Sequence, residues 1–172
     1  MAAKYELSDD SVVVVIGSGA GGGTLSNELA QKGVDENLGG PFGCVVVKDG
    51  QIIGEGSNQV TSTNDPTAHA EVVAVRDACR NLDSFQLTGC TVYTSCEPCP
   101  MCLGAIYWAR PEQIFIAGTR EDAAVAGFDD ELFYSELEKP NEQRELKMES
   151  LLREESQAVF QRWIEKPDKV EY

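Results

Sequence analysis

The sequence predicts an α/β domain, in which helices and a β-sheet pack in layers around one core. Strand-like and helix-like segments alternate along most of the chain, which is the pattern of layered α/β proteins. The chain has 172 residues, of which 42% are hydrophobic, so it is long enough to bury one sizeable core. Both clusters of chemically reactive residues fall where a predicted helix begins.

The predicted strands are short, largely apolar segments that end at turn residues. Asp49-Gly50 is a hairpin signal, because both positions tolerate a positive φ angle. The predicted strands are residues 12–16, 42–48, 51–56, 90–94, 113–117 and 145–148.

The predicted helices begin and end at recognisable signals. The loop at 64–67 caps the helix that follows it, Pro98 and Pro100 mark the start of another, and Gly33 stops the first. The predicted helices are residues 24–32, 68–81, 101–109, 132–138 and 151–164.

The charge of the chain argues against a nucleic-acid partner. Its 14 basic and 29 acidic side chains give a net charge of −15, and phosphate backbones repel such a surface. No apolar run approaches the roughly 18 residues that span a bilayer, so no membrane partner is expected. Glu6, Asp9 and Asp10 stand where a secretory signal needs positive charge, which predicts a cytoplasmic protein.

Three of the six cysteines lie within seven residues, which indicates a metal site in a reducing compartment. Cys99 and Cys102 lie three residues apart at the start of a predicted helix, so both sulfurs can reach one ion. With His69 as the third ligand, the fourth tetrahedral position stays open, as in catalytic zinc sites. The helix N-termini favour thiolates, and two thiolates with one imidazole balance Zn²⁺.

Two simpler interpretations compete with the metal site. His69 is the only histidine, and a Cys-x-x-Cys can be a redox pair or half of a structural zinc ribbon. A ribbon needs a second Cys-x-x-Cys, which is absent, because Cys96 belongs to the same cluster and is expected not to be a ligand. The remaining cysteines are expected to be small buried residues, and they are Cys44, Cys79 and Cys90.

Glu71 lies two residues after His69 and is expected to be the proton carrier of the site. A carboxylate beside a zinc-bound water can take its proton and pass it on. The combination H-x-E followed by P-C-x-x-C is the known signature of zinc deaminases.

Residues 39–172 resemble the bacterial guanine deaminases of the cytidine deaminase superfamily. The resemblance implies a three-layer α-β-α fold with a five-stranded mixed sheet and helices on both faces. It also implies Zn²⁺ as cofactor, conversion of guanine to xanthine and ammonia, and a homodimer that can exchange C-terminal segments. The stretches that carry it are GGPFGCVVVKDG (39–50), NDPTAHAEVVAVRDAC (64–79), TSCEPCPMCLGAIYWARP (94–111), AGFDDELFY (126–134) and FQRWIEKPDKVEY (160–172).

The resemblance also assigns individual residues. His69, Cys99 and Cys102 would hold zinc, and Glu71 would shuttle protons from the zinc water to N3 of guanine and then to the leaving amine. Asp130 would be a second catalytic residue that accepts hydrogen bonds from the N–H groups near C2, although a helix N-terminus alone would also favour it.

Five further residues match positions that surround the purine in this family. Tyr172, the last residue, would close over the site of its own chain or of a partner. Trp108 can equally be a plain core residue. The five matching residues are Phe42, Asn58, Ala70, Trp108 and Tyr172.

The N-terminal segment does not fit the deaminase pattern. Residues 17–22 form a G-x-G-x-x-G between a predicted strand and a helix, and residues 5–33 resemble the FAD-binding start of glucose–methanol–choline oxidoreductases. That motif needs a second strand after the helix, and none fits after Gly33, so no cofactor is expected there. We therefore expect a foreign or divergent appendage at 1–23 and a deaminase domain at 24–172.

The sequence leaves other functions open. The substrate can be another base or nucleoside, such as guanosine, cytosine or the adenosine of a tRNA, although the tRNA case predicts a basic surface that the charge opposes. A different class is an inactive fusion protein that carries a partial flavin-binding segment.

Overall fold

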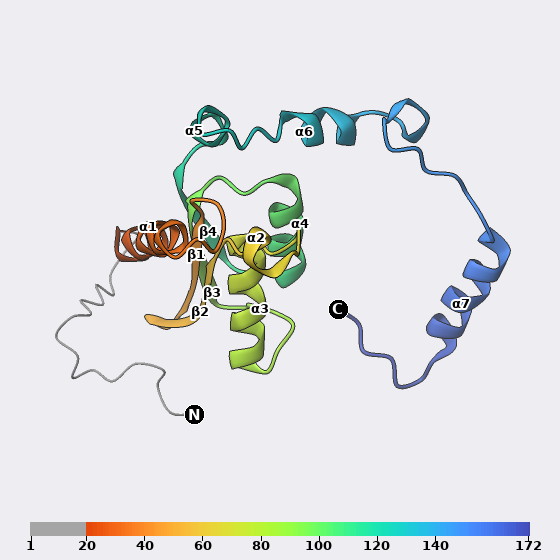
Figure 1. Cartoon of the computed structure of the whole chain (residues 1–172). Coiled ribbons are helices and arrows are strands. Elements are labelled where there is room, and N and C mark those ends of the chain that lie inside the picture. The colour runs from red at the N-terminus through yellow and green to blue at the C-terminus, as the bar shows by residue number, and fades with distance from the viewer. Residues whose placement is uncertain (1–19) are drawn as a thin grey trace. The chain divides into compact units, whose positions relative to one another are not determined.

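The structure is a computed structural model that describes residues 20–172 (Figure 1). The chain divides into two compact units, one that ends at Asp129 and one formed by Asp130–Tyr172, and each is described by itself. The predicted strand at 12–16 and most of the predicted appendage at 1–23 lie outside the described residues.

The first unit is built on a mixed sheet with the strand order β2-β1-β3-β4. β1 pairs antiparallel with both β2 and β3, whereas β3 and β4 are parallel. Asp49 and Gly50 have φ angles of 49° and 74° and join β1 to β2, as the hairpin signal predicted. The strands are β1 (Gly43–Lys48), β2 (Gln51–Ser57), β3 (Cys90–Cys96) and β4 (Gln113–Gly118).

The expectation of five strands is wrong for the described residues, which form a sheet of four. Residues 145–148 are an irregular stretch of the second unit, in which Leu146 and Met148 are 80% and 54% exposed. The backbone N–H of Glu145 donates to the Glu136 carboxylate at 2.7 Å. A short segment is stable as a strand only where it pairs with another strand and packs against an apolar surface. The described second unit provides neither for residues 145–148.

Helices cover both faces of the sheet, so the three-layer prediction is confirmed (Figure 1). α1 packs on β1 and β3 from one face, and α3 packs on β2 and β1 from the other, with α4 beside α3. The helices are α1 (Ala20–Asp35), α2 (Val60–Thr63), α3 (Ala70–Leu82), α4 (Pro100–Ala109), α5 (Arg120–Val125), α6 (Glu131–Glu138), the 3-10 helix η1 (Asn141–Gln143) and α7 (Arg153–Glu165).

Most predicted helices agree with the structure to within two residues, and these are the segments at 68–81, 101–109, 132–138 and 151–164. The short helices α2 and α5 were not predicted. α5 begins at a capping box, in which Thr119 and Asp122 exchange side-chain and backbone hydrogen bonds.

α1 lies close to the sheet, because glycines stand at its contact points. A Cβ on Gly22 would stand 2.4 Å from the ring of Tyr93, and a Cβ on Gly43 would stand 2.1 Å from the Ser26 carbonyl oxygen. The predicted helix at 24–32 therefore extends in both directions, and α1 includes residues 20–22 of the G-x-G-x-x-G motif. The helix also continues past Gly33, since packing on the sheet offsets the unfavourable helix propensity of glycine.

α3 meets β2 along a stripe of small residues. Ala70, Ala74 and Ala78 recur every four residues on the helix and are fully buried against β2. A Cβ on Gly54 would stand 2.5 Å from the Ala74 carbonyl oxygen, and Gly56 approaches Ala70 in the same way. This close approach sets the depth at which the first turn of α3 lies on the sheet.

The core lies between the sheet and α3. Cys44 and Cys90 are fully buried there, as expected for small apolar residues, whereas Cys79 is partly exposed. The core cluster comprises Cys44, Val46, Ala70, Ala74, Ala78, Leu87, Cys90, Val92 and Ala109.

The second unit contains α6, η1 and α7, and none of its helical residues is buried. The Arg144 side chain donates to the carbonyl oxygens of Glu136 and Lys139 at 2.9 and 3.0 Å, which ties the end of α6 to η1.

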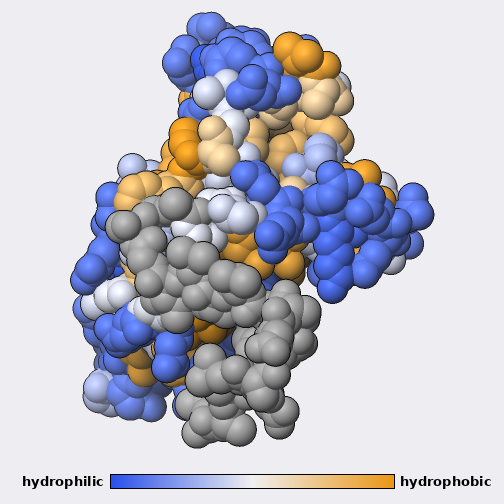
Figure 2. Space-filling model, turned by 90° about the vertical axis from the view of Figure 1, so that its left-hand side faces the viewer, coloured by the Kyte–Doolittle hydropathy of each residue, from blue (hydrophilic) through white to orange (hydrophobic). Residues whose placement is uncertain are grey.

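On the face of the molecule shown in Figure 2, hydrophilic residues predominate and apolar residues appear as groups between them. Within residues 20–172, no helix has the length and apolar character that a membrane crossing requires.

Candidate zinc centre

Three potential metal ligands converge at one end of the sheet. β2 and β3 run in the same direction, because each is antiparallel to β1, so α3 and α4 begin at the same sheet edge. His69 is the residue directly before α3, and Cys99 is the residue directly before α4. Cys102 lies in the first turn of α4. The order of the strands therefore brings together ligands that are about 30 residues apart in the sequence.

The geometry of these ligands fits a zinc ion. Nδ1 of His69 lies 3.6 Å from Sγ of Cys99 and 3.4 Å from Sγ of Cys102. In a tetrahedral site, Zn–S bonds of about 2.3 Å and Zn–N bonds of about 2.0–2.1 Å separate nitrogen from sulfur by about 3.6 Å. All three ligand atoms lie within 4.8 Å of one another. One histidine and two cysteines are a donor set that zinc prefers, and the set leaves one position open.

The two thiols share the negative charge unequally. A hydrogen bond from Cys102, together with His69, lowers the pKa of Cys99 to about 4. Hydrogen bonding to Cys99 and burial raise the pKa of Cys102. The hydrogen bond to Cys99 also raises the pKa of His69. Zinc binding requires both sulfurs to be thiolates, and the neighbours of Cys99 favour this form for that residue.

Glu71 lies in the first turn of α3 beside these ligands and is 5% exposed. Burial raises the pKa of its carboxyl group, and a hydrogen bond with the Cys102 side chain opposes that effect. The Thr94 hydroxyl donates to Oε1 of Glu71 at 3.2 Å. A carboxyl group that is buried next to a candidate metal site, with a raised pKa, has the properties of a general acid and base.

Contacts with the end of β4 hold the loop between β3 and α4. The backbone N–H of Glu97 donates to the Gly118 carbonyl oxygen at 3.0 Å, and the N–H of Arg120 donates to the Glu97 carboxylate at 3.4 Å. Sγ of Cys96 donates to the Thr119 carbonyl oxygen at 3.3 Å, and burial raises the pKa of Cys96 to about 11. Cys96 is therefore a neutral thiol that lies outside the ligand group.

Asn58 and Phe42 lie at the same end of the sheet. The side-chain oxygen of Asn58 accepts hydrogen bonds from the backbone N–H groups of Gly40 and Val60, both at 3.2 Å. The backbone N–H of Asn58 donates to the Phe42 carbonyl oxygen at 3.0 Å. Because the side-chain oxygen is engaged twice, the amide nitrogen of Asn58 is the group that remains to donate to a ligand.

Phe42 and Ala70 are held by packing. The Phe42 ring meets the Phe128 ring edge to face, with centroids 4.9 Å apart. Ala70 stands between His69 and Glu71 as the first residue of α3, and it is fully buried.

The other three predicted site residues lie away from the metal ligands or in the second unit. Trp108 lies in the last turn of α4, six residues after Cys102, and its side chain is 64% exposed. Asp130 is the N-cap of α6, and Tyr172 is the last residue, 70% exposed. Both belong to the second unit. Their roles at the site stay predictions.

Thr94, Glu97 and Phe128 were not predicted from the sequence to belong to the site. The sequence did contain a signal for Thr94, because this polar residue lies in a strand that was predicted to be buried. A buried hydroxyl group needs a hydrogen-bond partner. The contacts of Glu97 and Phe128 depend on how distant segments pack, for which the sequence offers no local signal.

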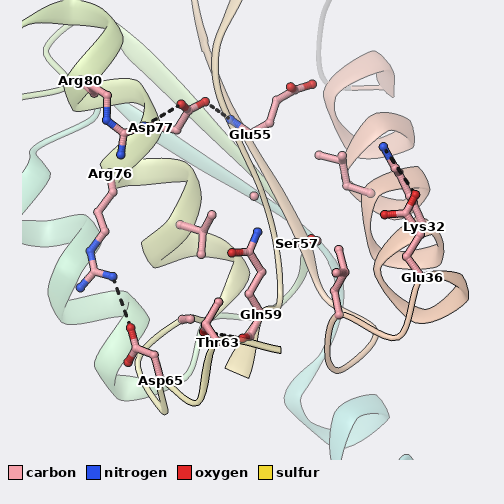
Figure 3. Close-up of a pocket in the computed structure, with 15 residues that line it drawn as sticks. Lys32, Glu36, Glu55, Ser57, Gln59, Thr63, Asp65, Arg76, Asp77 and Arg80 are labelled. Carbon is pink, nitrogen blue, oxygen red and sulfur yellow. Dashed lines mark hydrogen bonds and ion pairs between the residues drawn. The ribbon is translucent and has the colours of Figure 1, made fainter. Parts of the chain in front are cut away.

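A groove of about 600 Å³ lies at the outer edge of β2, between α1 and α3 (Figure 3). Its charged side chains pair with one another: Lys32 lies 3.9 Å from Glu36, and Arg76 lies 3.7 Å from Asp65. None of the predicted site residues lines it. The groove is therefore distinct from the candidate zinc centre.

Comparison with known proteins identifies a matching family. Residues 24–118 match the family described as the cytidine and deoxycytidylate deaminase zinc-binding region. The guanine deaminase of Bacillus subtilis is 56% identical over 144 residues, which cover 84% of this chain and 92% of that protein. An X-ray structure of the Bacillus subtilis enzyme matches with a TM-score of 0.86 and 53% identity, over 88% of this chain and 96% of that one.

A second group of relatives is more distant. The tRNA-specific adenosine deaminase of Aquifex aeolicus is 43% identical over 77 residues, which cover 45% of this chain and 51% of that protein. All these matches are to deaminases, and they do not support the resemblance of residues 5–33 to an FAD-binding segment.

Proposed function

Because the chain belongs to the cytidine and deoxycytidylate deaminase family, with a zinc-binding region at 24–118, we infer that it is a zinc-dependent enzyme that deaminates guanine. The observation that carries this inference is the 56% identity to a guanine deaminase over 84% of the chain. A stretch of that length includes both clusters of ligand residues. The reaction adds water to C2 of guanine and releases ammonia, which leaves xanthine.

His69, Cys99 and Cys102 would hold the zinc ion, as the distances of 3.6 and 3.4 Å from Nδ1 of His69 to the two sulfur atoms support. When bound, Zn²⁺ acts as a Lewis acid that lowers the pKa of a water molecule to about 7. Glu71 would take one proton of the attacking water and deliver it to N3 of the base as the bond between C2 and oxygen forms. It would then move the proton of the new C2 hydroxyl group to the amino nitrogen, so that the bond between C2 and nitrogen breaks, ammonia leaves and the bond between C2 and oxygen becomes a double bond.

The buried position of Glu71 suits this role. Burial raises the pKa of this carboxyl group toward the operating pH, so the same group can take a proton in one step and return it in the next. Glu71 lies in the first turn of α3, and the proposed zinc ligand His69 comes directly before that helix. The helix therefore holds Glu71 beside the metal site, and the side chain needs no large movement between the two proton transfers.

Recognition of guanine is proposed to depend on complementary hydrogen bonds. The amide nitrogen of Asn58 donates to an acceptor on the purine, because its side-chain oxygen is engaged by two backbone N–H groups. Asp130 accepts from the N–H groups near C2, where a charged acceptor makes the stronger bond. The proposed surroundings of the base are completed by Phe42, Ala70, Trp108 and Tyr172.

The alternative substrates fit less well. A tRNA substrate requires basic surface, whereas the chain has a net charge of −15, and it spans only about half of the tRNA-specific relatives it matches. The same zinc-dependent reaction could also deaminate free guanosine or cytosine. Discrimination against them would therefore depend only on the contacts around the base.

We further propose a homodimer in the cytoplasm, with the deaminase domain beginning at residue 24. Tyr107 and Trp108 on α4 are 75% and 64% exposed, and apolar groups of this size on one helix are typical of an interaction surface. None of the six cysteines forms a disulfide, which suits a reducing compartment.

The test is to incubate the purified protein separately with guanine, guanosine, cytosine and adenine and to follow ammonia. Guanine is expected to be converted to an equal amount of xanthine, with the other three at least about a hundredfold slower in kcat/KM. Cytosine and adenine lack the hydrogen-bonding pattern of guanine, and guanosine carries a ribose that a site for the free base has to exclude. Release of ammonia from another substrate but not from guanine would overturn the proposal.

A further inference from the structure

We propose that Thr94 is a positioning residue, whose hydroxyl group holds the Glu71 carboxylate in the orientation that proton transfer requires. The inference rests on the proposed role of Glu71. The two side chains come from different layers of the fold, Thr94 from β3 and Glu71 from α3, and both are almost fully buried at 1% and 5% exposure. Oγ1 of Thr94 donates to Oε1 of Glu71 at 3.2 Å.

The position of Thr94 in the sheet explains this contact. Every second residue of β3 is buried, so Val92, Thr94 and Cys96 point toward the layer of α3 and α4. Across the sheet, Thr94 is paired with Cys44 of β1, a thiol whose pKa is raised by burial and which therefore stays neutral. The inner face of the sheet beneath Glu71 thus presents a hydroxyl group and a neutral thiol.

Thr94 lies outside the group of potential metal ligands, which are His69, Cys99 and Cys102. Its hydroxyl group is therefore available to Glu71 whether or not those side chains hold a metal. The hydrogen bond joins the sheet to the first turn of α3, where the proposed proton carrier lies.

A proton carrier must keep its orientation between two proton transfers. The Glu71 side chain has three rotatable bonds, and burial alone does not choose one oxygen over the other. The donor from Thr94 fixes Oε1, which leaves the second carboxylate oxygen to face the reacting groups. Misplacement of a catalytic group by about 1 Å can cost a hundredfold in rate, so a fixed orientation has a measurable effect.

The first experiment removes the hydroxyl group without changing the shape of the side chain. Thr94→Val is expected to lower kcat for guanine about ten- to a hundredfold, with KM within about threefold of wild type and zinc content unchanged. Thr94→Ser keeps the hydroxyl group and is expected to retain kcat within about threefold. Thr91→Val is the matched control, because Thr91 lies in the same strand on the opposite face and should leave kcat unchanged.

A second pair of variants covers the case in which Thr94→Val does not fold. Thr94→Ala and Thr94→Ser both lack the methyl group, and only the serine keeps the hydroxyl. A large difference in kcat between them isolates the hydroxyl group. The dissociation constant for xanthine, measured by calorimetry, should be the same in both, because a positioning residue for Glu71 does not hold the base.

A double-mutant cycle tests whether Thr94 acts through Glu71. In a Glu71→Gln background, Thr94→Val should change the residual rate by less than about twofold, since no proton carrier remains to be positioned. The same ten- to a hundredfold loss in that background would overturn the inference. So would wild-type kcat in Thr94→Val, or equal losses in Thr94→Ser and Thr94→Ala.

The same measurements separate this inference from the proposed function. If the wild-type protein does not act on guanine, the proposed function fails. If Glu71→Gln retains full activity on guanine, the proton-carrier role of Glu71 fails, and the role of Thr94 fails with it. If Glu71→Gln is inactive while Thr94→Val is fully active, only the role of Thr94 is wrong.

Discussion

Gly56 lies directly beneath Ala70: a Cβ built on Gly56 would stand 2.2 Å from the Ala70 carbonyl oxygen. Ala70 separates His69 from Glu71, so this one contact sets the height of a metal ligand and of the proton carrier above the sheet. The atom in the way belongs to the backbone, which cannot move aside as a flexible side chain would.

Gly56→Ala is therefore expected to destabilise the fold by about 1–3 kcal/mol, the usual cost of overpacking, and to weaken zinc binding. Gly23→Ala is the control, because a Cβ there meets nothing within 4 Å and alanine favours the helix by up to about 1 kcal/mol. Denaturant unfolding of both variants, together with zinc titration, checks the expectation. Equal stability of the two variants would contradict it.

The ligand set can be tested by metal analysis. Wild-type protein should hold about one zinc ion per chain and lose activity when a chelator removes it. Cys99→Ala should lose zinc, whereas Cys96→Ala should keep it, because the Cys96 thiol bonds to the Thr119 carbonyl oxygen instead. Active, folded protein without zinc would exclude the proposed centre.

Glu71→Gln should keep the fold and the zinc ion but lower kcat by several orders of magnitude. The amide has nearly the same shape as the carboxyl group and cannot carry a proton, so the loss falls on the chemical step. Steady-state kinetics with guanine measure it. Turnover within about tenfold of wild type would show that another group carries the proton.

Asn58→Asp separates two functions of one side chain. A carboxylate still accepts from the N–H groups of Gly40 and Val60, but it has no donor for the base. KM for guanine should therefore rise about tenfold or more. Asn58→Ala should raise KM and also lower stability by about 1–2 kcal/mol, because both N–H groups lose their acceptor. A wild-type KM in Asn58→Asp would exclude a donor role.

Deletion of Tyr172 tests the proposed aromatic lid. An aromatic ring over a flat base excludes water and stacks on it, so the deletion should raise KM or lower kcat while zinc is retained. Removal of residues 1–11 serves as the comparison and should change activity little. Full activity after the C-terminal deletion would rule out the lid. A loss of activity confined to the N-terminal deletion would show that residues 1–11 are needed for activity and Tyr172 is not.

The parts of the fold that the sequence predicted are those with a local signal. The turn at Asp49-Gly50 and the starts of α3 and α4 depend on residues within a few positions of each other. The candidate ligands were found for the same reason, because zinc needs cysteines at a fixed spacing and a histidine at a helix start. Their convergence at 3.4–3.6 Å then follows from the strand order.

The parts that could not be predicted depend on distant contacts. The early start of α1 follows from the fit of Gly22 against Tyr93, which lies 71 residues later in the sequence and outweighs the low helix propensity of glycine. The bond between Thr94 and Glu71 exists only once α3 has packed on the sheet. Residues 145–148 show the reverse case, since this segment was predicted as a strand and has no partner strand among the described residues.

The exposure of Trp108 has a spectroscopic consequence. The chain has two tryptophans, Trp108 on α4 and Trp163 on α7, and they are 64% and 41% exposed. Indole emission shifts to shorter wavelength when water around the ring is replaced by apolar groups. A Trp163→Phe variant therefore leaves Trp108 as the single tryptophan, and its emission reports whether anything covers α4 in solution.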